Sequence, residues 1–134
     1  MSGSDAETAY RDFHRNLLTQ FIHATQQQPP FVNDQADEQA LEYLNQLESL
    51  PSLQGIEYSE QGQRLLTQTI ASFAHLTPLL PRDLLWHFGG DCLHYMPDEE
   101  IEKFQRLDEQ FHQAVSAGEA FDYSKERARI LGLH

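Results

Sequence analysis

Three polar residues near the middle of the chain have the types and spacing of a metal-binding group. His87, Asp91 and His94 follow one another at intervals of four and three residues, so on a helix they lie within about 60° of one another. Two imidazoles and a carboxylate are donors that Zn²⁺, Fe²⁺ or Mn²⁺ accepts. The pattern therefore indicates either a metal site or a polar stripe that faces solvent or a partner. We favour the stripe and expect no cofactor, because residues from one straight helix cannot enclose an ion.

Two further polar residues fall where an apolar stripe is expected. In helical angle Asp108 lies between Phe104, Leu107 and Phe111, and His112 follows one turn later at the edge of the stripe. A carboxylate on an apolar face is costly unless it is paired. We therefore expect a buried polar pair of Asp108 and His112, or a bond from Asp108 to a group on a facing helix. An acid/base group with a shifted pKa is the alternative.

Enzymatic chemistry finds little further support in the sequence. The single cysteine, Cys92, falls on the apolar side of its predicted helix, opposite His87 and His94, and buried thiols are usually inert. The chain contains no Gly-rich phosphate loop, no G-x-S-x-G and no H-E-x-x-H. The prediction therefore leans away from an enzyme.

The cellular compartment is indicated by the cysteine content and the N-terminal residues. One cysteine permits no internal disulfide, and the polar N-terminal residues lack the features of a secretory signal. The apolar runs are too short to span a membrane. We therefore expect a cytoplasmic protein.

Charge is distributed unevenly along the chain. The 21 acidic and nine basic residues give a net charge of -12, which opposes general binding to nucleic acids or anionic membranes. The 48 residues from 16 to 63 contain seven acids and no Lys or Arg, whereas Lys125, Arg127 and Arg129 lie in the last ten residues. This asymmetry permits an acidic partner surface and a basic tail that docks on it or on a neighbour. The candidate surface residues are Asp34, Asp37, Glu38 and Glu42.

Three interpretations of the acidic surface stay open. It can bind another protein, it can imitate nucleic acid and occupy the basic groove of a regulator, or it can simply keep the protein in solution. We favour protein binding. The abundant leucine and aromatic residues also favour a homodimer.

Apolar residues follow a helical period over most of the chain, and the helices that this pattern predicts must position all of the residues named above. Apolar residues recur at steps of three and four, and proline or glycine separates the segments. The predicted helices span about 4–27, 34–50, 60–77, 81–94, 97–117 and 124–131. No segment is convincing as a strand. The sequence therefore predicts an all-α fold, a compact bundle of five to six helices in a single domain over residues 1–134.

The helix predicted over 81–94 differs from the others because it is apolar around most of its circumference. Such a helix usually lies at the centre of a domain, so we expect Trp86 and Phe88 to be largely buried. Gly89 and Gly90 in its middle indicate either close packing against a neighbouring helix or a local break.

The 18-residue run LLWHFGGDCLHYMPDEEI, residues 84–101, resembles the hallmark of a small helical bacterial family whose members are uncharacterised. The resemblance implies a cytoplasmic bacterial protein and implies no particular activity or catalytic residue. With the charge pattern, it leads us to expect a helical protein that binds another protein or a second copy of itself.

Overall fold

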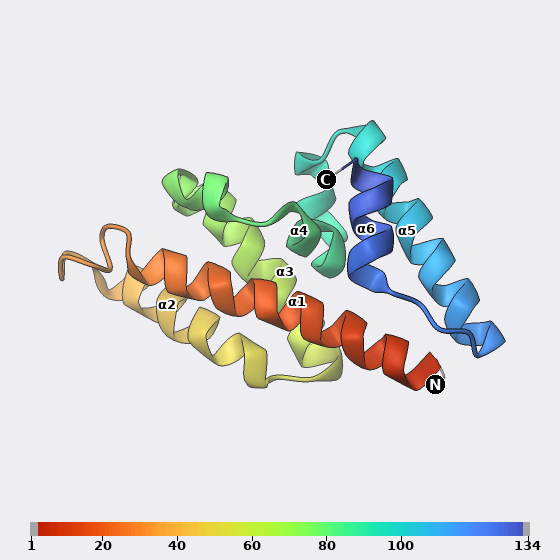
Figure 1. The fold of residues 1–134 in the computed structure, drawn as a ribbon. Helices are drawn as coiled ribbons and strands as arrows, with labels where there is room; N and C mark the ends of the chain where they lie inside the picture. The colour runs from red at the N-terminus through yellow and green to blue at the C-terminus, as the bar shows by residue number, and fades with distance from the viewer. Residues whose placement is uncertain (1–2, 133–134) are drawn as a thin grey trace. The chain divides into compact units, whose positions relative to one another are not determined.

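The computed structural model describes residues 3–132, and every regular element in that range is helical (Figure 1). Within the described range the α-helices are α1 (Gly3–Gln26), α2 (Glu38–Ser49), α3 (Gly55–Ser72), α4 (Arg82–Phe88), α5 (Asp98–Ala117) and α6 (Tyr123–Leu131). Short 3₁₀ segments are η1 (Leu50–Ser52), η2 (Ala74–Leu79) and η3 (Gly90–Tyr95). The predicted all-α class is confirmed.

The chain divides into two compact units. Unit 1 comprises Met1–Arg15 and Met96–His134, and unit 2 comprises Asn16–Tyr95. Helix α1 crosses the boundary, so its first half belongs to unit 1 and its second half to unit 2. The single domain over residues 1–134 stays a prediction.

Unit 1 is held together by an apolar cluster to which α1, α5 and α6 all contribute. Helices α5 and α6 pack side by side (Figure 1), and the stacked rings of Tyr10 and Phe111 lie 4.5 Å apart between centroids. The buried members of the cluster are Ala6, Leu107, Phe111, Tyr123 and Ile130. Leu107 and Phe111 belong to the apolar stripe that predicted the helix over 97–117, which explains why α5 forms close to where it was predicted.

Unit 2 is organised around α3. This helix contacts α2, α4 and all three 3₁₀ segments, and its residues Leu65 and Leu66 are fully buried. The fourth helix is therefore not the central element that its apolar circumference suggested. Phe88 of α4 is buried, as expected, whereas Trp86 is only half-buried.

The predicted helix over 81–94 is wrong, because α4 ends at Phe88. Gly89 has φ 66° and ψ -147°, and Gly90 has φ 63°. Two successive residues with positive φ are accessible to glycine at little cost, but they cannot continue a right-handed helix. Residues 90–95 instead form η3, so the glycine pair makes the local break.

Two other helix starts differ from the prediction. Helix α3 begins at Gly55 instead of residue 60, and its first turn carries the 74% exposed Ile56. Helix α2 begins at Glu38 because Asp37 caps it, with the Asp37 carboxylate accepting a hydrogen bond from the Ala40 amide at 2.8 Å. Asp34, which was placed at the start of this helix, lies in the preceding turn with φ 56°. Within residues 3–132 no helix combines the length and the apolar character that crossing a bilayer requires.

Candidate functional site

The break at Gly89 separates the three residues of the proposed metal group. His87 lies half-buried on α4, and its Nε2 atom lies 3.2 Å from the Tyr58 hydroxyl of α3. Asp91 and His94 are exposed on η3. Among the described residues, no group of three or more His, Cys, Asp and Glu side chains is arranged to hold a metal ion. The shared helix face on which the metal interpretation depended is therefore absent.

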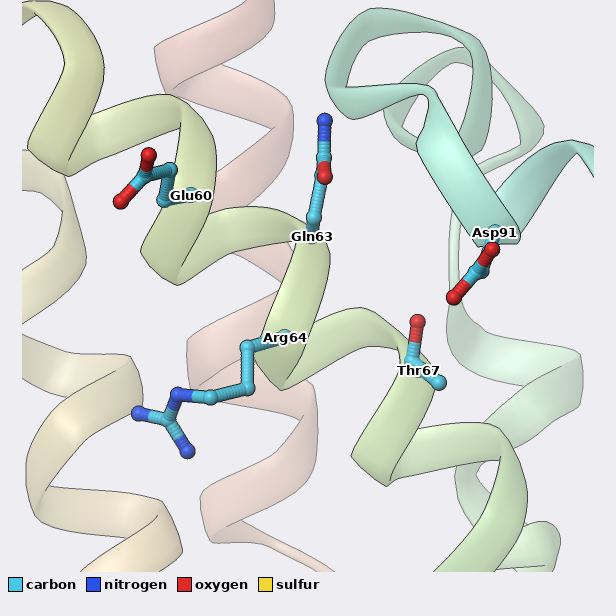
Figure 2. A pocket seen from close by; sticks show the side chains of 5 residues that line it. All are labelled: Glu60, Gln63, Arg64, Thr67 and Asp91. Carbon is cyan, nitrogen blue, oxygen red and sulfur yellow. The ribbon is translucent and has the colours of Figure 1, made fainter.

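Asp91 instead lines a pocket together with residues of α3. The α3–η3 pocket has a volume of about 300 Å³, and Figure 2 shows the five side chains around it. They are Glu60, Gln63, Arg64 and Thr67 from α3 and Asp91 from η3. The four α3 residues are three, four and seven positions apart, so they share one face of the helix. Sequence reasoning missed them because a polar helix face resembles an ordinary solvated surface.

The side chains of the pocket point in different directions. The Thr67 hydroxyl and the Asp91 carboxylate are turned toward one another (Figure 2). The Arg64 guanidinium is turned toward α2, where it donates a hydrogen bond of 2.6 Å to Gln46 Oε1. The positive charge is thus drawn away from Asp91.

Gln63 is held in one orientation by η3 and the end of α4. Its Nε2 atom donates to the Phe88 carbonyl oxygen at 2.8 Å. A Cβ atom on Gly90 would lie 2.7 Å from Gln63 Oε1, a separation that real Cβ atoms essentially never show. A side chain at position 90 would therefore displace the Gln63 amide from this position, whereas glycine leaves room for it.

Cys92 anchors η3 beneath the pocket. It is fully buried, and its Sγ atom lies 3.7 Å from Thr67 Oγ1 and 3.8 Å from the Gln63 carbonyl oxygen. Burial raises the pKa of the Cys92 thiol, and the hydrogen bond with Thr67 partly opposes that rise. A neutral, enclosed thiol is a poor nucleophile.

Asp108 and His112 do not form the buried pair that the sequence led us to expect. Asp108 is half-buried on α5, with its Oδ1 atom enclosed. His112 is exposed and lines an open groove of about 610 Å³ along α5. The helix is turned so that position 112 lies outside the buried stripe formed by Phe104, Leu107 and Phe111.

The four residues of the predicted acidic surface are all exposed, although they are not equivalent. Asp34 belongs to the turn before α2, and Asp37 caps that helix. Glu38 and Glu42 lie one turn apart on the exposed side of α2, next to Leu41, which is 51% exposed. We call Glu38, Leu41 and Glu42 the α2 face. No Lys or Arg of the described chain forms an ion pair with these four carboxylates.

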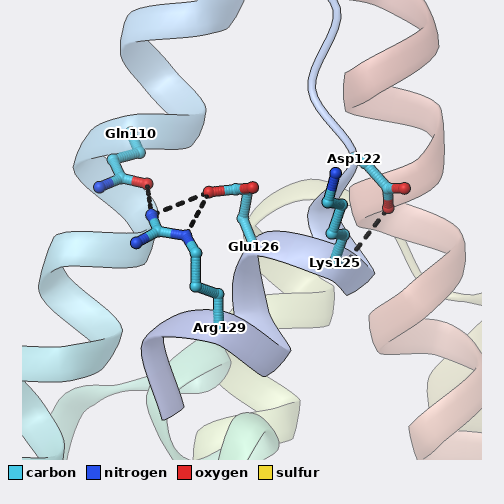
Figure 3. A network of polar contacts seen from close by, with 5 residues as sticks. All are labelled: Gln110, Asp122, Lys125, Glu126 and Arg129. Atoms are coloured by element: carbon cyan, nitrogen blue, oxygen red, sulfur yellow. Dashed lines mark hydrogen bonds and ion pairs between the residues drawn. The ribbon is translucent and has the colours of Figure 1, made fainter. Parts of the chain in front are cut away.

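Two of the three basic residues near the C-terminus have partners inside unit 1. Arg129 lies 2.9 Å from Glu126 Oε1 and donates to Gln110 Oε1 at 3.2 Å (Figure 3). The Arg127 guanidinium carbon lies 5.3 Å from the centroid of the Phe13 ring, within range of a cation–π contact. These contacts tie α6 to α5 and to the first half of α1.

The fold and these sites define an all-α protein with an acidic surface and a small polar pocket. A family model described as PA2817-like matches residues 6–134, and the chain belongs to this family, whose members are uncharacterised. No curated protein and no solved structure matches the chain.

Proposed function

We propose that the protein acts by binding a basic segment of another protein through the α2 face. The observation that carries this proposal is the separation of charge. Unit 2 contains nine of the 21 acidic residues but only two of the nine basic residues. One of those two, Arg64, bonds an amide oxygen of α2 rather than a carboxylate. Glu42 accepts a hydrogen bond from Gln46 and Glu48 accepts one from Gln26, but within the described residues no Lys or Arg forms an ion pair with an acid of α2, so their charge is available to cations from outside.

Leu41 gives the α2 face an apolar centre. A half-exposed leucine next to two glutamates can bury its remaining surface against an apolar side chain, while the neighbouring carboxylates pair with Lys or Arg. Covering the exposed half of a leucine stabilises a complex by about 1 kcal/mol. The charges contribute mainly to the association rate and to partner choice.

The partner that fits this face carries two or three cationic residues around one apolar residue. An amphipathic helix with Lys or Arg three or four positions from a leucine presents such a pattern. A two-fold homodimer through the α2 face would bring its glutamates against one another. The predicted homodimer therefore needs another surface, such as the one around Ile56, and light scattering measures it independently.

A comparative pull-down from a lysate of the source cells tests the proposal. The baits are the wild-type protein, the double variant Glu38→Lys/Glu42→Lys, and the control Glu99→Lys/Glu102→Lys. The control alters the net charge equally and places its changes at exposed positions early in α5. We expect a protein that the wild type and the control retain, that the α2 variant loses, and that high salt releases.

Two outcomes decide against the proposal as stated. If the α2 variant and the control retain the same proteins as the wild type, the α2 face is not the binding surface. If the retained protein is a nucleic-acid-binding regulator that DNA displaces from the bait, the surface acts as a nucleic-acid mimic.

A further inference from the structure

Helices α2 and α6 carry opposite charges. The nine residues of α6 include three basic side chains and the single acid Glu126, which gives this helix a net charge of +2. The basic residues are Lys125, Arg127 and Arg129. The twelve residues of α2 include three glutamates and no basic residue, which gives it a net charge of -3. Because every copy of the chain carries both helices, opposite charges favour association between two copies.

The charged residues on the two helices also have the same spacing. The two glutamates of the α2 face lie one turn apart, and its leucine directly precedes the second of them. On α6, Lys125 and Arg129 lie one turn apart, and the half-buried Ala128 directly precedes the second. We call these three residues the α6 face. Since residues three and four apart share one side of a helix, both glutamates of one α2 face can pair with the two cations of one α6 face, while the leucine is covered by the apolar parts of α6.

The cations of the α6 face are accessible. Among the described residues the Lys125 ammonium takes part in no ion pair, and Asp122 bonds only the Lys125 backbone amide. Arg129 bonds Glu126 and Gln110 through its Nε and Nη2 atoms (Figure 3). Its side chain is 59% exposed, and its Nη1 atom keeps two N–H donors. Both residues can therefore pair with a carboxylate of another molecule without unfolding α6.

We infer that the α6 face of a second copy of the chain occupies the α2 face, an inference that rests on the proposed function of that face. The contact joins unlike surfaces, so α6 is the further surface that a homodimer requires. Two such contacts about a two-fold axis close a dimer, and one contact repeated head to tail gives a longer assembly. A basic segment of another protein then binds only by displacing α6, so self-association regulates access to the α2 face.

Light scattering of the full chain over a range of concentrations tests the contact. We expect a mass above 15.5 kDa that grows with protein concentration and falls as salt is added. The variants Glu38→Lys/Glu42→Lys and Lys125→Glu/Arg129→Glu should each associate at least about tenfold more weakly, because like charges then meet. An equal mixture of the two variants should associate like the wild type, because each variant then offers the face that the other needs.

A control and a milder variant separate the contact from general charge and from damage to the fold. Lys103→Glu/Arg106→Glu makes the same change of charge at two exposed positions of α5 in the same unit, and should associate like the wild type. Lys125→Glu alone removes no ion pair within the described residues and should still weaken association. A wild-type mass of 15.5 kDa at every concentration, an equal loss in the control, or unchanged association of Lys125→Glu and of both double variants overturns the inference.

The pull-down distinguishes this inference from the proposed function. Lys125→Glu/Arg129→Glu keeps the α2 face intact, so it should retain the partner of the wild type, and more of it, because its own α6 no longer competes. A partner retained by a wild type that does not self-associate refutes this inference and leaves the proposed function standing. Self-association through the two faces without any retained partner refutes the proposed function and leaves this inference standing.

Discussion

The contact between Gly62 and Phe88 joins α3 to α4 and offers a direct test of how unit 2 is packed. A Cβ atom added to Gly62 would lie 2.1 Å from Cε1 and 2.2 Å from Cδ1 of the Phe88 ring. Ordinary contact begins at about 3.4 Å, so the ring would have to move by more than about 1 Å. The ring is 4% exposed and packs against Tyr58 and His87, which leaves it little room to do so.

The size of the effect follows from two opposed contributions. Overpacking a buried site typically costs about 1–3 kcal/mol, while replacing glycine by alanine inside a helix returns about 1 kcal/mol. We therefore expect Gly62→Ala to lower the free energy of unfolding by up to about 2 kcal/mol. Phe88→Ala creates a cavity and should lower it by about 3–5 kcal/mol.

The double variant Gly62→Ala/Phe88→Ala separates packing from other causes. Once the ring is gone, the alanine introduced at position 62 meets no obstacle and contributes only its better helix propensity, so it should stabilise the Phe88→Ala protein by up to about 1 kcal/mol. The difference between the two backgrounds corresponds to a coupling free energy of about 1–3 kcal/mol between the two positions.

Urea unfolding of the four proteins, followed by far-ultraviolet circular dichroism, measures this cycle. Additive effects within about 0.5 kcal/mol would show that the ring does not pack on Gly62. A Phe88→Ala protein that melts within a degree or two of wild type would refute the burial of Phe88 itself.

Two further predictions concern the break after α4 and the buried hydroxyl pair of unit 2. Gly89→Ala should lower the free energy of unfolding by about 1–3 kcal/mol, because φ 66° with ψ -147° is a conformation that alanine rarely adopts; an unchanged urea midpoint would contradict the break. The Tyr43 hydroxyl lies 2.6 Å from Thr69 Oγ1, and burial raises the pKa of Tyr43 from 10.0 to about 12. The neutral phenol therefore contributes stability that is complete below pH 10 and is lost as the pH rises toward 12, so the stability advantage of wild type over Tyr43→Phe should shrink by up to about 1.4 kcal/mol per pH unit in that window. A difference that stays constant between pH 8 and pH 11.5 would contradict it.

Local signals in the sequence predicted most helices well. The helix predicted over 97–117 forms as Asp98–Ala117, and the one predicted over 4–27 forms as Gly3–Gln26. Both carry a long apolar stripe, and proline or glycine marks the end of each, so neighbouring residues alone determine their limits. Helix α3 was harder, because its first turn begins at a glycine with φ 62° and exposes Ile56, neither of which is a usual helix start.

The candidate residues were harder to place than the helices because their neighbours depend on one break in the backbone. Periodicity counts positions along a continuous helix, and on that count Asp91 belongs with His87 and His94. Gly89 and Gly90 have positive φ, so the helix ends at Phe88 and helical spacing no longer relates the residues on its two sides. Asp91 consequently faces Thr67 of α3, and His87 faces Tyr58.

A glycine pair in a helical pattern is compatible either with close packing against a neighbouring segment or with a break in the helix. At Gly90, close approach and break occur together: the positive φ turns the chain out of α4, and the missing side chain then lets η3 pack on the Gln63 amide. The polar residues of α3 could be read from the sequence as one helical face, but only this backbone path places a carboxylate opposite them. The chemistry of the pocket therefore depends on the two glycines as much as on the residues that line it.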